Sequence, residues 1–128
     1  MDFIRNYFEE YGDAFSGRLK ASGFSDDLAK EFLTEIASGI FHIIKNANLE
    51  KTIKILLSDN PSQLLRLINV YEMATKLGIN TEQTSSGLDA IAPVVSQVFS
   101  LKRHEIVAAT ASLAWQTKDE SIDSVSNF

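Results

Sequence analysis

Apolar residues recur at helical spacing along nearly the whole chain, with polar residues on the opposite face. The pattern predicts a first helix over residues 2–21, weakened by two glycines and ended by Gly23. A second helix is predicted to begin after Ser25, whose hydroxyl is a typical N-cap. The apolar stripe of the first helix is Phe3, Tyr7, Tyr11 and Phe15, and that of the second is Leu28, Phe32, Leu33, Ile36, Ile40, Ile43 and Ile44.

Breaking and capping residues divide the middle of the chain. The sequence 46–48, Asn-Ala-Asn, predicts a break before a short third helix. A fourth helix is predicted from Pro61 to Gly78, because proline fits the first helical position and Asn60 can cap it. The apolar face of the third helix is expected to be Leu49, Ile53, Leu56 and Leu57, and that of the fourth Leu64, Leu65, Ile68, Tyr71 and Leu77.

Two further helices complete the pattern. A fifth helix is predicted to begin after Asn80 or Thr81, with Pro93 kinking or splitting it. A sixth covers about residues 102–115. No alternation typical of strands competes with these helices, so we predict an all-α fold, a single bundle of five or six helices.

A short internal repeat links two of the predicted corners. Residues 23–37 and 78–92 share a helix-ending glycine, an apolar residue, a capping residue and a later Leu-x-x-Ile-Ala. Two corners with the same capping requirement would explain the match. A duplicated helical hairpin, giving a pseudo-symmetric bundle, would explain it as well.

Length and composition indicate one globular domain. The chain has 128 residues, of which 45% are hydrophobic and 23% charged. We predict a helical domain over residues 1–116 and a disordered polar tail over 117–128. The net charge of −5 disfavours binding to nucleic acid or to anionic membranes, and the absence of cysteine excludes disulfides and thiolate metal sites.

The sequence contains no export signal or membrane span. The first ten residues lack a basic start followed by an apolar run. The longest apolar stretch, Ile36 to Ile44, is interrupted by Ser38, Gly39 and His42. It is shorter than the ~18 residues of a spanning helix, so we predict a soluble, cytoplasmic protein.

Residue patterns for catalysis are missing. His42 and His104 stand far apart, and neither has a partner at metal-binding spacing. The neighbouring carboxylates are typical of helix starts and solvated faces, and the glycines are too dispersed for a phosphate loop. We therefore predict a protein that is not an enzyme, with no catalytic residue, metal or cofactor.

A helix-turn-helix is the one DNA-binding motif that the chain resembles. Residues 74–80 match its first half, but Thr84 and Gly87 stand where apolar residues are expected. No lysine or arginine lies between Gly78 and Leu101. Nucleic-acid binding is accordingly unlikely for this chain and stands only as a weak alternative.

Five of the twelve aromatic residues lie in the first fifteen positions. They either pack into the core or remain partly exposed to bind a partner helix. We predict a protein–protein interaction or self-assembly module, with candidate interface residues Phe3, Tyr7, Phe8 and Tyr11. The alternative is a helical bundle that binds an apolar small molecule or lipid.

Two corners carry a family resemblance. Residues 19–25, and residues 77–80 leading to Ile-Ala-Pro-Val-Val at 91–95, resemble the YidB-like families of small uncharacterised bacterial proteins. The resemblance covers about residues 15–100. It implies a helical fold and a bacterial source, and it implies no active site.

Overall fold

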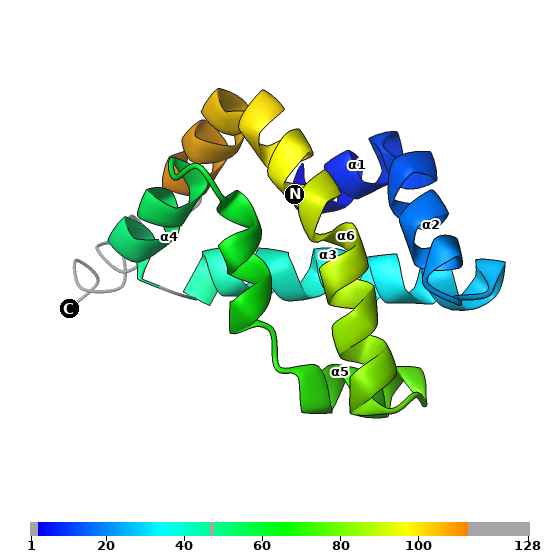
Figure 1. The fold of residues 1–128 in the computed structure, drawn as a ribbon. Helices are drawn as coiled ribbons and strands as arrows, with labels where there is room; N and C mark the ends of the chain where they lie inside the picture. The colour runs from blue at the N-terminus through cyan, green and yellow to red at the C-terminus, as the bar shows by residue number, and fades with distance from the viewer. Residues whose placement is uncertain (1–2, 47, 113–128) are drawn as a thin grey trace, which may run out of the picture.

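The computed structural model describes residues 3–46 and 48–112, and within these ranges it contains helices and no strand (Figure 1). The all-α prediction is confirmed. The predicted tail at 117–128 and the end of the sixth helix lie outside the described residues. The helices are α1 (Phe3–Glu10), α2 (Gly12–Ala21), α3 (Asp26–Asn46), α4 (Leu49–Leu56), the 3₁₀ helix η1 (Pro61–Leu67), α5 (Val70–Leu77), α6 (Thr81–Leu101) and a helix at 103–112.

The predicted number of helices, five or six, is wrong, because the described residues form eight helical segments. The predicted first helix is divided at Tyr11, which has φ −105° and ψ 22°. The bend brings Phe8 of α1 onto Phe15 of α2, with ring centroids 4.5 Å apart, so both rings enter one core. Burial of this aromatic pair outweighs the hydrogen bonds of one straight helix.

The predicted fourth helix is divided as well. Its first part, Pro61–Leu67, forms the 3₁₀ helix η1, and a separate helix, α5, starts three residues later at Val70. The Asn69 side chain accepts a hydrogen bond of 3.0 Å from the backbone N–H of Glu72 and so caps a new helix. The break changes the helical phase, and Tyr71 no longer shares a face with Leu64 and Leu65.

Most of the predicted caps are confirmed. Ser25 accepts from the Leu28 N–H at 3.2 Å, and Asn80 accepts from the Gln83 N–H at 2.7 Å. Asn60 differs, because its side-chain oxygen accepts from the hydroxyls of Ser62 and Ser96 and from no backbone N–H in the described structure. Its bond to Ser96, 3.0 Å long, ties the start of η1 to α6.

Helix α6 continues through Pro93 as one element, so the proline does not split it. Thr84 and Gly87, the two residues that depart from the helix-turn-helix pattern, are both buried on this helix. The Thr84 hydroxyl donates to the carbonyl oxygen of Asn80 at 3.0 Å, which allows a polar side chain in the core.

The internal repeat extends beyond the two corners. Gly23 and Gly78 both have positive φ, 100° and 69°. The Phe24 N–H bonds to the Leu19 carbonyl at 3.0 Å, and the Ile79 N–H bonds to the Ala74 carbonyl at 3.1 Å. Each corner is followed by a helix of 21 residues, and α6 begins and ends 55 positions after α3.

Packing between the two halves is reciprocal. Helix α1 packs on α3 as η1 packs on α6, while α2 contacts both α3 and α6, and α5 contacts both α6 and α3. Four equivalent positions are buried in both long helices. They are Phe32, Ile36, Ile40 and Ile44 in α3, and Gly87, Ile91, Val95 and Phe99 in α6. This arrangement supports the interpretation as a duplicated hairpin in a pseudo-symmetric bundle.

Candidate functional site

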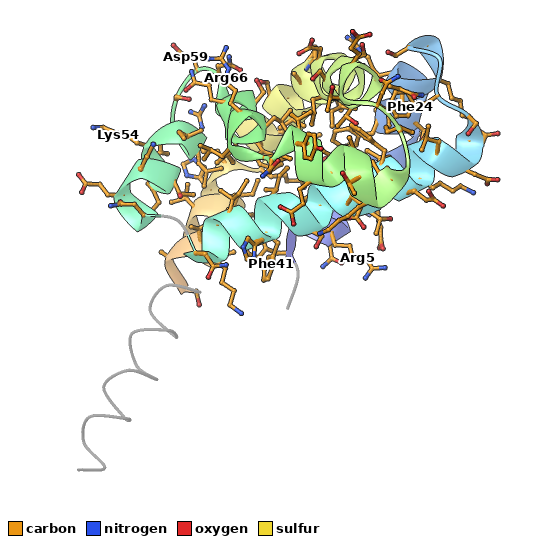
Figure 2. All side chains as sticks on the ribbon, turned by 90° about the horizontal axis from the view of Figure 1, so that it is seen from below. Arg5, Phe24, Phe41, Lys54, Asp59 and Arg66 are labelled. Atoms are coloured by element: carbon orange, nitrogen blue, oxygen red, sulfur yellow. The ribbon has the colours of Figure 1, made fainter. Side chains whose placement is uncertain are left out.

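The four aromatic residues predicted as an interface lie against the body of the protein. Phe8 is 4% exposed and stacks on Phe15. Phe3 is half-buried and meets the ring of Phe41, labelled in Figure 2, edge-on, with centroids 6.0 Å apart. Tyr7 and Tyr11 are also half-buried and pack on the core. Their role in binding a partner stays a prediction, with Phe8 the least accessible of the four.

Tyr7 links the two ends of the described chain. Its hydroxyl donates a hydrogen bond of 2.9 Å to Oε2 of Glu105, in the helix at 103–112. Burial raises the pKa of the Tyr7 phenol to about 12, and the hydrogen bond to Glu105 and nearby carboxylates act in the same direction. The neutral phenol is therefore a structural donor at physiological pH.

The two histidines are on the surface and do not meet. His104 is exposed near the start of the 103–112 helix. His42 is exposed on α3, with its Nδ1 atom 3.1 Å from the Asn46 side-chain amide nitrogen. The same amide nitrogen donates to the backbone carbonyl of His42 at 3.0 Å, so the Asn46 side chain holds the ring on the surface of α3. Within residues 3–46 and 48–112 no group of three His, Asp or Glu side chains could hold a metal ion.

A groove of about 340 Å³ lies between α3 and the η1–α5 segment. We call it the Gly39 groove. Ser38, Gly39 and His42, the three residues that interrupt the apolar run of α3, all line it. Its full lining is Glu35, Ser38, Gly39, His42, Ile43, Leu67, Ile68, Asn69, Glu72, Met73 and Lys76.

Helix α5 contributes polar and apolar side chains to this groove, namely Glu72, Met73 and Lys76. Helices α2 and α5 differ in residue size at equivalent positions of the repeat: α2 carries Phe15 and Leu19, both fully buried, and α5 carries Val70 and Ala74. Neither Val70 nor Ala74 lines the Gly39 groove.

Gly39 is not required by the packing of the fold. A Cβ atom at this position would approach Ile68 Cγ1 to 3.8 Å, an ordinary contact distance. Glycine inside a helix is less favourable than alanine by about 1 kcal/mol. At Gly87, by contrast, a Cβ atom would lie 2.7 Å from the rings of Phe24 and Phe32. The repeat places the buried Val94 of α6 at the position of Gly39.

Exposed apolar side chains continue from the groove. Leu67 lines it and is 43% exposed, and Tyr71, four residues later, is 76% exposed. Leu57 and Leu101 are exposed elsewhere, at the ends of α4 and α6. Leu57 and Tyr71 were expected on buried faces. Their exposure corrects that prediction, since α4 ends at Leu56 and the η1–α5 break rotates Tyr71 outward.

Of the two carboxylates that line the groove, Glu72 has an ion-pair partner among the described residues and Glu35 has none. Lys76 Nζ lies 3.8 Å from Glu72 Oε1, so these two neutralise each other. Glu35 is half-buried, and its side chain takes part in no hydrogen bond or ion pair of the described structure. The groove thus combines apolar side chains with one carboxylate that has no ion-pair partner among the described residues.

Two other grooves are related to each other by the repeat. One, of about 300 Å³, lies between α1–α2 and α3 and includes Leu33 and Ala37. The other, of about 390 Å³, lies between η1–α5 and α6 and includes the equivalent Leu88 and Ala92. Both halves of the fold form this groove, so we attribute it to the shared packing geometry.

Sequence patterns alone did not identify the Gly39 groove. The available signal was the polar and small interruption at 38, 39 and 42 in a helix that is otherwise apolar. None of the helices in the described ranges is long and apolar enough to span a bilayer. Comparison of the chain with protein-family models, curated proteins and solved structures found no match.

Proposed function

We propose that this protein is a non-enzymatic helical interaction module whose binding surface is the Gly39 groove together with Leu67 and Tyr71. The observation that carries the proposal is Gly39 itself. It weakens the middle of a central helix, and the packing around it would accept a side chain. A residue that costs stability without a packing reason is typical of a functional surface.

The exposed side chains next to the groove support the same conclusion. Tyrosine is among the residues enriched at energetically dominant interface positions, because its ring covers a large area and its hydroxyl can still bond to a partner. Tyr71 is mostly exposed, and Leu67 extends the apolar lining to the surface. A partner that enters the groove would cover both.

Self-assembly is the first form of interaction to test. Size-exclusion chromatography with light scattering, over a wide concentration range, would show whether copies of the chain associate. We expect association that the double variant Leu67→Ser, Tyr71→Ser abolishes. The matched control is Leu57→Ser, Leu101→Ser, which removes exposed leucines outside the groove lining. Equal loss in both double variants would contradict the proposed surface.

If the chain is monomeric, the same two double variants are compared as baits in a pull-down from cell extract. A partner bound by the wild type and the control, but not by the groove variant, would support the proposal. A partner retained by the groove variant would place the interaction on another surface.

A small apolar ligand is the second candidate. The groove volume of about 340 Å³ falls at the lower end of the range of roughly 300–1,000 Å³ for ligand sites. Native mass spectrometry of the purified protein would detect a retained lipid or fatty acid. A mass equal to that of the bare chain would argue against this second function and leave the first in place.

A further inference from the structure

We propose that the Gly39 groove receives a lysine or arginine side chain from a segment of a partner protein, with Glu35 as its counter-ion. The inference rests on the proposed function and specifies the chemistry of the occupant. It follows from the charges, the shape and the surroundings of the groove.

The charge argument starts from Glu35. Its carboxylate is half-buried and lacks an ion-pair partner among the described residues. The one lysine that lines the groove, Lys76, is already paired with Glu72. His42, which also lines the groove, forms no ion pair with Glu35 in the described structure. The groove therefore has one uncompensated negative charge, and a cation is its complement.

The shape argument concerns the aliphatic part of that cation. Ile43, Ile68 and Met73 line the groove beside Glu35. Lysine and arginine bury an apolar stem while their charged end reaches a polar group. Gly39 lies on α3 four residues after Glu35, one helical turn along the same face, and its missing side chain leaves room for such a stem.

The surroundings favour a protein segment over a free amine. Leu67 of the lining and Tyr71, which stands on α5 between the lining residues Asn69 and Glu72, are exposed apolar side chains that a small amine would leave uncovered. A segment with apolar residues on either side of one lysine or arginine would cover this surface and fill the groove. It would also match the net charge of −5 of the chain.

The test uses a library of random twelve-residue peptides displayed on phage and selected on the immobilised full chain. We expect enriched peptides to contain one lysine or arginine flanked by apolar residues. The best peptide is then synthesised and titrated into the isotopically labelled protein, followed by NMR. The amide signals of Glu35, Gly39, Ile68 and Met73 should shift most, because these residues line the groove.

The variant Glu35→Gln removes the charge and keeps the shape. We expect it to weaken the peptide about tenfold, the loss that corresponds to ~1.4 kcal/mol for a partly desolvated ion pair. The matched control is Glu31→Gln, one turn earlier on α3, exposed and outside the groove lining, which should change the affinity less than about twofold. Thermal melts of both variants verify that they are folded.

The outcomes separate this inference from the proposed function. Peptides that bind in the groove without a cation, or that tolerate Glu35→Gln, overturn the inference and leave the interaction surface standing. Equal sensitivity to both glutamine variants overturns it too, because the effect would be a general one of charge. Selection of no binding peptide overturns the inference alone, because the interaction surface is tested by light scattering and pull-down. Peptides that bind only another face overturn both.

Discussion

The two long helices, α3 and α6, have equal length and equivalent places in the repeat, yet their glycines serve different purposes. Gly87 of α6 lies where the rings of Phe24 and Phe32 leave no room for a Cβ atom. Gly39 of α3 lies where a Cβ atom would make only ordinary contact with Ile68. The first is explained by core packing and the second is not, so the second identifies the candidate site.

The surroundings of the two glycines differ in the same way. Gly87 is buried against the rings of Phe24 and Phe32, whereas Gly39 lines a groove between α3 and the η1–α5 segment. We attribute the first contact to stability and the groove to binding, and the predictions below test this difference.

The largest effect is expected from Phe32→Ala. Phe32 is fully buried and meets Phe24 edge-on, with centroids 5.1 Å apart. Its truncation should lower the free energy of unfolding by about 3–5 kcal/mol through lost burial and a residual cavity. Chemical denaturation followed by circular dichroism measures this. A loss under about 1 kcal/mol would mean that the centre of the repeat is not a close-packed contact.

Gly87→Ala should come next, with a loss of about 1–3 kcal/mol. The added methyl would lie 2.7 Å from Phe24 and Phe32 ring atoms, so the rings must shift and the gain in helix propensity is outweighed. In the Phe32→Ala background, Gly87→Ala should lower the free energy of unfolding by less, because the clash with the Phe32 ring is gone. Equal costs in both backgrounds would contradict the contact.

Tyr7→Phe tests the hydrogen bond between Tyr7 of α1 and Glu105 of the 103–112 helix. We expect it to lower the free energy of unfolding by about 0.5–1.5 kcal/mol at neutral pH. The folded state raises the pKa of this phenol from 10.0 to about 12. Its stabilising contribution is therefore complete below pH 10 and declines as the pH rises towards 12. The difference between wild type and variant in urea melts should narrow over that interval and remain constant at lower pH.

Gly39→Ala should have the smallest effect on folding and the opposite sign. Alanine is more favourable than glycine inside a helix by up to about 1 kcal/mol. The new methyl group would lie 3.8 Å from Ile68 Cγ1, an ordinary contact distance. We expect a higher melting temperature together with weaker binding in the groove. Gly17→Ala in α2 is the control, because a Cβ atom there meets no atom within 4 Å and the substitution should stabilise the fold without affecting binding. Destabilisation by Gly39→Ala would remove the basis of the proposed site.

Local signals in the sequence were sufficient for most of the fold. The all-α class, the break at 46–48 and the caps at Ser25 and Asn80 depend on residues within a few positions of each other. The glycine corners were visible for the same reason, since positive φ is required wherever they occur. These features need no information about distant parts of the chain.

Tertiary contacts decided the rest. The first helix bends at Tyr11 because Phe8 gains more by stacking on Phe15 in the core than by extending a straight helix. Tyr71 is exposed because Asn69 starts a new helix in another phase. Whether Gly39 lies in a filled contact or lines a groove depended on which distant residues pack against this part of α3. Periodicity along the chain shows that a face is apolar, whereas only the packing of distant helices determines whether that face is filled or left open.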